Sequence, residues 1–148
     1  MIWADSWLYS EAPKLHVEEW VTEKPETEGK YILIQFWHTF SPPSLRMIPH
    51  LNDWHEKYKD ELAIICISDE EVEVVRKSTE QHVKFFSAVD TQNRTHSELH
   101  VFGLPHVIII EPQHGCVIWE GFPLLKGYEL TEKTIKKILA IGRKLKKQ

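Results

Sequence analysis

Cysteine is scarce in this sequence: its 148 residues include only two, Cys66 and Cys116. Two cysteines do not form the disulfide framework of a small secreted domain, and they say little about the compartment. A chain of this length can bury a core of its own without such cross-links. We therefore expect one domain over residues 1–148, with residues 1–13 as an N-terminal extension.

Long apolar runs and an excess of basic residues are also absent. No run approaches the roughly 18 apolar residues of a membrane-spanning helix. The first five residues lack the basic start and apolar stretch of a signal peptide, although the chain could be the mature part of a longer precursor. The formal net charge of -4 disfavours a nucleic-acid partner. We expect no membrane span and no nucleic-acid binding.

Two near-continuous apolar segments are present, Tyr31–Trp37 and Leu62–Ser68. Such segments are typical of strands that are covered on both faces of a sheet. A parallel pair of strands needs a crossover connection, usually a helix, between them. Apolar residues one helical turn apart predict that helix, with Pro49 inside it as a kink. Its expected inward residues are Leu45, Ile48, Leu51, Trp54 and Tyr58.

The second half of the chain predicts a β-hairpin followed by a helix. Apolar segments at 106–111 and 116–121 flank a turn that contains Pro112 and Gly115. Thr131 can cap the last helix, whose expected inward residues are Ile135, Ile138, Leu139 and Leu145. We also expect a short edge strand over 14–21, a helix at 69–77, a strand at 83–89 and a short helix at 91–100. This order implies a mixed sheet with helices on both faces.

Two serines separated by two prolines lie where the first strand gives way to the helix. Ser41 fits an N-cap, and Pro42 fits the first helical position, where its missing N–H costs nothing. A strand end that meets a helix start is the usual place for a site in an α/β sheet. Free N–H groups and the positive helix end favour an anion or a thiolate there. Two cysteines would form a redox dithiol at this turn, but the chain has Ser41 and Ser44.

These motifs resemble the thioredoxin fold, and most closely the TlpA/ResA-like (AhpC/TSA-type) thiol-disulfide oxidoreductases. The hallmark run of that family, Phe-Trp-Ala-Thr-Trp-Cys-Pro-Pro-Cys, is matched at residues 36–44 by Phe-Trp-His-Thr-Phe-Ser-Pro-Pro-Ser. Pro49 matches the helix-kinking proline of the family. Residues 101–105 resemble its Val-x-Gly-x-Pro motif, whose proline is cis and faces the dithiol. Residues 111–115 resemble its Asp-Pro-x-Gly hairpin.

The resemblance covers about residues 14–141, and segments within it look like family members from Bacteroidetes-type bacteria. It implies a three-layer α/β fold, with a mixed central sheet between helices and a cis-proline, Pro105, before the third core strand. It also implies a periplasmic or cell-envelope location.

The departures from the family pattern occur at the positions of the redox cysteines and beside them. Ser41 replaces the attacking cysteine and Ser44 the resolving one. A serine hydroxyl forms no disulfide, and it is not ionised near neutral pH. His38 and Phe40 also replace the family's small residue and tryptophan. The serines were either introduced by engineering or reflect a natural loss of the dithiol. We favour the natural loss, because engineering would normally change only the cysteines.

We predict a redox-inert module that binds an extended segment of a protein or peptide partner. The residues expected to line its groove are Trp37, His38, Phe40, Pro42, Pro43, Leu104, Pro105 and His106. Trp37 and Phe40 are placed near the surface of that groove. The alternative is a thiol-disulfide oxidoreductase whose cysteines were mutated. We expect a monomer that uses no cofactor.

Three other chemistries have less support. Serine nucleophiles with His38 or His106 as base would need an orienting group and an oxyanion hole, for which no signature exists. These histidines are expected to converge, but a metal needs three or four ligands and Ser44 is a poor one, so we expect no metal. Cys66 and Cys116 fall on strands at opposite sides of the central strand, so we expect two free thiols, with Cys66 buried.

Overall fold

The computed structural model describes residues 6–80, 82–101 and 103–147, which form six strands and four helices. In chain order these elements are β1 (Glu19–Trp20), β2 (Tyr31–Phe36), α1 (Pro42–Tyr58), β3 (Leu62–Ser68), α2 (Val72–Thr79), β4 (Phe86–Val89), α3 (Arg94–Leu99), β5 (His106–Ile110), β6 (Val117–Gly121) and α4 (Glu132–Lys146). Among the described residues, no helix has both the length and the apolar character that crossing a membrane requires.

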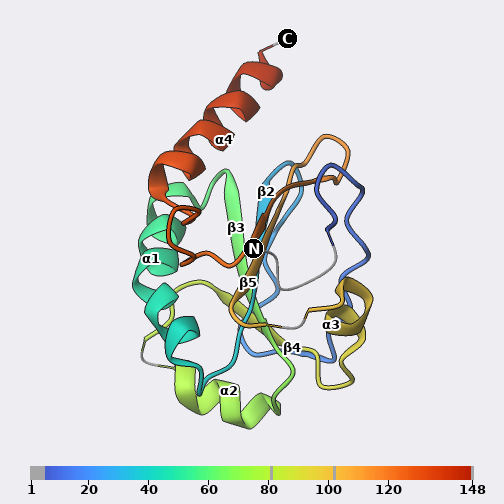
Figure 1. Ribbon diagram of the computed structural model, residues 1–148, viewed down its shortest axis with the longest axis vertical. Helices are drawn as coiled ribbons and strands as arrows, with labels where there is room; N and C mark the ends of the chain where they lie inside the picture. The colour runs from blue at the N-terminus through green and yellow to red at the C-terminus, as the bar shows by residue number, and fades with distance from the viewer. Residues whose placement is uncertain (1–5, 81, 102, 148) are drawn as a thin grey trace.

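The strands form one sheet in the order β1-β4-β3-β2-β5-β6. β2 and β4 run parallel to β3, whereas β1, β5 and β6 pair antiparallel with their neighbours. Figure 1 shows α1, α2 and α4 on one side of this sheet and α3 on the other. The mixed sheet between helices confirms the predicted fold class.

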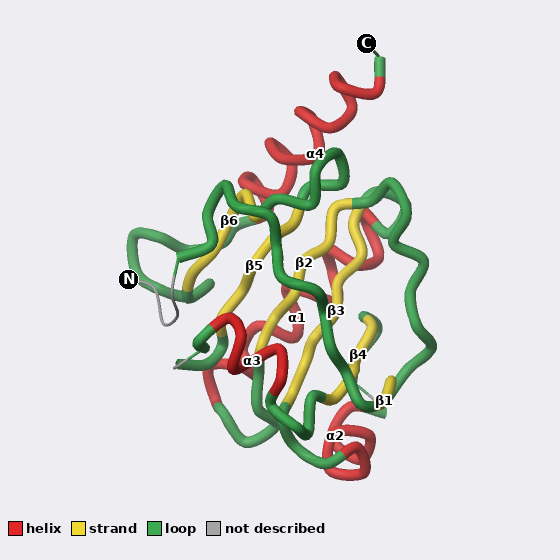
Figure 2. The backbone as a smooth tube through the Cα atoms, turned by 90° about the vertical axis from the view of Figure 1, so that its right-hand side faces the viewer, coloured by secondary structure: helices red, strands yellow, loops and turns green. Residues whose placement is uncertain are grey.

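Alternate residues along the strands divide the core into two faces, because successive side chains of a strand point to opposite sides. The α1 face includes Leu33, Ile64 and Ile109, which pack with buried residues of α1, α2 and α4. The α3 face includes Ile34 and Ile108, which pack with Leu99 of α3 and with residues that precede β1. Figure 2 shows the chain before β1 crossing the strands on the side of α3.

Helix α1 begins as the sequence predicts, and Leu51 and Trp54 are buried as expected, but its first two turns bury other residues than predicted. Ser41 is the N-cap, Pro42 opens the helix, and Pro49 lies inside it. The buried residues are Ser44, Met47, Leu51 and Trp54, whereas Leu45 is 40% exposed. The expectation of an inward Leu45 was wrong, because the 44-47-51-54 series has the helical spacing that faces the sheet.

Other boundaries also differ from the expectations. The edge strand β1 has two residues and not the span 14–21, and α2 begins at Val72 and not at residue 69. Thr131 caps α4 as predicted, but Leu145 is 43% exposed. Figure 1 shows the reason: the end of α4 extends past the sheet, so its last turn has no core to enter. Both cysteines are free, and Cys66 is buried, as predicted.

Candidate functional site

Three segments meet at the edge of the sheet where β2 ends. The register pairs Phe36, the last residue of β2, with Ile67 of β3 on one side and with His106 of β5 on the other. The turn 37–44 therefore lies between the residues that follow β3 and those that precede β5. This edge is where side chains from different elements converge in an α/β sheet.

The hydroxyl oxygens of the two serines in the turn accept hydrogen bonds from backbone N–H groups. Ser41 Oγ accepts from the N–H of Ser44 at 3.4 Å, which is the helix cap. Ser44 Oγ accepts from the N–H of His38 at 3.4 Å, and Ser44 is fully buried. Ser41 is half-buried. Both hydroxyls thus stabilise the turn and the start of α1, and Ser44 is not reachable from solvent.

An acidic network that the sequence analysis missed lies beside this turn. Glu70 Oε1 accepts from the N–H of Thr39 at 2.9 Å, and Glu70 Oε2 accepts from the Thr39 hydroxyl at 2.7 Å. Ser68 Oγ donates to Glu70 Oε1 at 2.7 Å, and the Glu70 side chain is only 8% exposed. The carboxylate therefore ties the loop after β3 to the loop after β2. The only signal in the sequence was an acidic residue shortly after a buried strand.

The imidazole of His38 is turned toward the same carboxylates. Its Nε2 lies 2.9 Å from Asp69 Oδ1, and its Nδ1 lies 3.7 Å from Glu70 Oε2. Its ring nitrogens therefore contact acids and not the serine hydroxyls, so His38 is not arranged as a base for either serine.

His106 lies deeper in the fold, with 1% of its surface exposed. Its ring stacks on Phe36 with the centroids 6.3 Å apart. Burial lowers the pKa of His106 to about 4, although the Glu120 carboxylate opposes part of that effect. His106 is therefore neutral at pH 7. The expectation that it would line a groove with His38 was wrong, because its pairing with Phe36 directs it into the α3 face.

Trp37 was also expected near the surface, and it is fully buried. Its backbone N–H donates to the backbone carbonyl of Ile67 at 3.1 Å, which continues the pairing of β2 with β3. Trp37 follows Leu33 in the alternation of the strand, so its indole joins the core on the α1 face. Pro105 is buried as well, and the Leu104–Pro105 peptide bond is cis.

The predicted site residues that remain accessible form a smaller surface than expected. Phe40 is 79% exposed, an unusual exposure for a phenylalanine, and Pro42 is also exposed. We call the accessible set the turn surface; it comprises His38, Phe40, Ser41, Pro42, Pro43 and Leu104. Within residues 6–80, 82–101 and 103–147, no group of three or more histidine, cysteine or acidic side chains is placed to hold a metal ion.

The sheet order, the capped helix after β2 and the proline before β5 define a thioredoxin-like protein. The family model of the AhpC/TSA family matches residues 10–118, and the chain belongs to that family.

Curated relatives are similar to this chain in sequence. The thiol-disulfide oxidoreductase ResA of Bacillus thuringiensis subsp. konkukian is 29% identical over 129 residues, 83% of this chain and 72% of that protein. ResA of Halalkalibacterium halodurans is 28% identical over 99 residues, 65% of this chain and 56% of the relative.

Two solved structures share the fold. The thioredoxin domain of a thiol-disulfide oxidoreductase from Bacteroides vulgatus has a TM-score of 0.72 and 21% identity, over 88% of this chain and 96% of that one. A thiol-disulfide isomerase from Corynebacterium glutamicum also has a TM-score of 0.72, with 18% identity, over 87% of this chain and 94% of that one.

Proposed function

We propose that this protein is a redox-inert member of its family that binds an extended segment of a partner protein or peptide at the turn surface. The observation that carries the proposal is Phe40, which is 79% exposed on a turn whose neighbouring residues His38, Thr39 and Ser44 are hydrogen-bonded. An exposed aromatic side chain on a fixed backbone is a typical anchor for a binding interface, because little entropy is lost when it is covered.

The proposed absence of redox chemistry is supported by the residues at positions 41 and 44. Disulfide exchange needs a thiolate that attacks and a second thiol that resolves the mixed disulfide. Ser41 and Ser44 supply two hydroxyls, and both accept hydrogen bonds from the backbone. Cys66 does not substitute for them, because it is buried and burial raises the pKa of its thiol.

The backbone beside the turn surface suits pairing with an extended chain. Residues 103–105 lie next to the turn and include the cis peptide bond before Pro105. Main-chain groups of this loop, which precedes the interior strand β5, can bind an extended partner segment without regard to its exact sequence, and side-chain contacts then add specificity. Phe40 would supply the apolar contact. From the family resemblance we also propose that this binding takes place in the periplasm or cell envelope.

The test is an NMR titration of the 15N-labelled protein with reduced, carboxamidomethylated insulin B chain, an extended polypeptide without free thiols. Saturable shift changes are expected at the amides of residues 38–41, of Ser44 and of residues 103–104; Pro42 and Pro43 have no amide N–H. Amides of α4, far from the turn in Figure 1, serve as the internal control. Binding that perturbs α4 while the turn stays unchanged would refute the proposed site.

The alternative is the family enzyme, a thiol-disulfide oxidoreductase in which both cysteines were replaced. The positions of residues 41 and 44 favour this alternative. Residue 41 caps α1 and residue 44 is buried at its start, so cysteines at these two positions would lie at the start of the helix, as the family resemblance implies. The double variant Ser41→Cys/Ser44→Cys separates the two accounts in an insulin-reduction assay. Strong activity in the variant would support a silenced enzyme. No activity would support a module whose turn has been remodelled around His38 and Phe40.

A further inference from the structure

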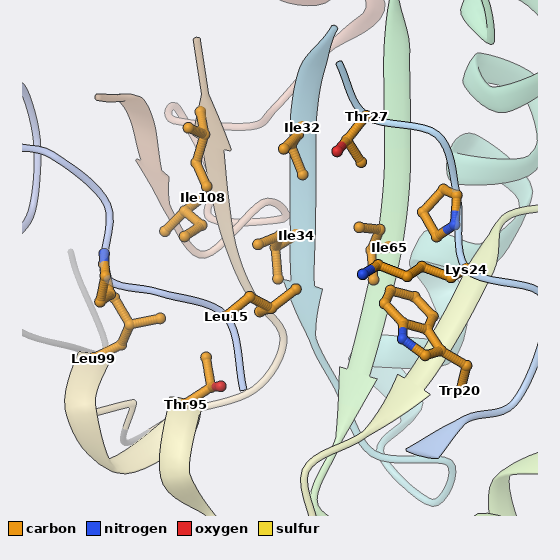
Figure 3. A pocket seen from close by; sticks show the side chains of 13 residues that line it. Leu15, Trp20, Lys24, Thr27, Ile32, Ile34, Ile65, Thr95, Leu99 and Ile108 are labelled. Atoms are coloured by element: carbon orange, nitrogen blue, oxygen red, sulfur yellow. The ribbon is translucent and has the colours of Figure 1, made fainter. Parts of the chain in front are cut away.

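An apolar cavity lies on the α3 face, away from the turn surface. Its volume is about 250 Å³. Figure 3 shows the isoleucines of the sheet along one wall, with Leu99 of α3, Leu15 and Trp20 around them. The sheet residues of this wall are Ile32, Ile34, Ile65, Ile108 and Ile110.

The cavity exists because this face is covered by little regular structure. α3 has six residues, and the rest of the cover is β1, the extended chain before it and the loop after it. That chain is nevertheless fixed. The N–H of His16 donates to Thr95 Oγ1 at 2.8 Å, the Thr95 hydroxyl donates back to the His16 carbonyl at 2.6 Å, and the N–H of Ala12 donates to the carbonyl of Gly115 at 2.8 Å. The segment that covers the cavity is therefore held by hydrogen bonds on both sides of Leu15.

The walls determine what such a cavity can hold. An apolar cavity of about 150 Å³ stays dry and admits benzene, so this larger one has room for a bigger hydrocarbon body. The hydroxyl of Thr95 is already paired with His16. The walls therefore favour an apolar ligand, and they offer it few polar contacts.

A cation lies at the mouth of the cavity. Lys24 is exposed, and no carboxylate among the described residues forms an ion pair with it. Figure 3 shows its side chain reaching from the loop after β1 toward the isoleucines of the sheet. An ammonium group without an ion pair at the rim of an apolar cavity complements a ligand that carries one negative charge at its end.

We propose that this cavity binds a small amphipathic carboxylate, with its hydrocarbon body against the isoleucines and its carboxylate at Lys24. This site is independent of the turn surface. The variant Phe40→Ala is therefore expected to leave carboxylate binding unchanged, so the two proposals fail separately.

The test uses sodium decanoate, at concentrations below micelle formation, and follows isoleucine methyl groups by NMR. Saturable shift changes are expected for Ile34, Ile65 and Ile108. Ile64 and Ile135 report on the α1 face and are expected to stay unchanged. Decanol and decyltrimethylammonium are the neutral and cationic comparisons. The absence of saturable changes, or equal changes on both faces, would overturn the proposal.

The variant Lys24→Met tests the charge. It is expected to weaken decanoate binding about threefold, as for an exposed ion pair, and to leave decanol binding unchanged. Lys126→Met is the matched control, because Lys126 is an exposed lysine on a distant loop. Equal decanoate affinity in the wild type and in Lys24→Met, or tighter binding of decyltrimethylammonium than of decanoate, would overturn the assignment of a carboxylate.

Discussion

The two faces of the sheet are covered in different ways, and the difference explains where each site lies. On the α1 face, three helices pack against the strands, and the buried stripe of α1 runs from Ser44 to Trp54. On the α3 face, a six-residue helix and an extended segment leave a cavity of about 250 Å³. The close-packed face fixes the start of α1 and the turn before it. The less closely packed α3 face leaves an internal cavity, and no residue of the turn lines it.

The largest expected effect contrasts one leucine from each face. Leu51 is fully buried against the sheet, and Leu51→Ala is expected to lower the free energy of unfolding by about 3 kcal/mol. Leu15 is half-buried beside the existing cavity, so Leu15→Ala is expected to cost only about 1 kcal/mol. Urea unfolding of both variants measures the two losses. Equal losses would contradict the contrast between the faces.

The next effect is a dependence of stability on pH that comes from His106. Its pKa is about 4 in the folded protein, against an ordinary value of 6.5. The unfolded chain therefore binds more protons between these two pH values. The contribution of the neutral imidazole is complete above pH 6.5, falls by about 2 kcal/mol at pH 5, and is lost as the pH passes below 4.

The variant His106→Leu is the means of measuring this contribution. Its unfolding free energy is expected to fall less than that of the wild type between pH 7 and pH 5. Burial also lowers the pKa of His55, and that part of the pH dependence is common to both proteins. Parallel pH profiles for the two proteins would show that His106 does not titrate as the structure implies.

The smallest effect on stability concerns the acidic network beside the turn. Glu70→Gln removes the charge from a carboxylate that accepts from Thr39 and Ser68, and it is expected to cost about 1.5 kcal/mol. Glu71→Gln is the matched control, since Glu71 is exposed and its side chain caps nothing. Thermal unfolding compares the two variants. An equal shift for both would mean that Glu70 does not hold the turn.

Much of the fold could be predicted because its signals are local. Apolar runs identified the strands, Ser41 and Pro42 identified the start of α1, and Thr131 identified the start of α4. The register of side chains could not be predicted in the same way. Leu45 and Met47 are both apolar, and only the position of the helix on the sheet decides that Met47 is buried.

The candidate site was predicted less well than the fold, because accessibility depends on contacts between distant segments. Phe40 was correctly placed at the surface, but Trp37 and His106 were not, since each continues the alternation of a strand into the core. Glu70 was missed for a related reason. Its role depends on Thr39, which is 31 residues away in sequence.

The most direct test of the central claim measures how a single exposed side chain affects partner binding. Fluorescence anisotropy with labelled, carboxamidomethylated insulin B chain compares the wild type with Phe40→Ala and with Tyr128→Ala, whose tyrosine is 72% exposed elsewhere on the surface. We predict that Phe40→Ala weakens binding about tenfold or more and that Tyr128→Ala leaves it unchanged. Wild-type affinity in Phe40→Ala, or equal losses in both variants, would contradict a binding site on the turn surface.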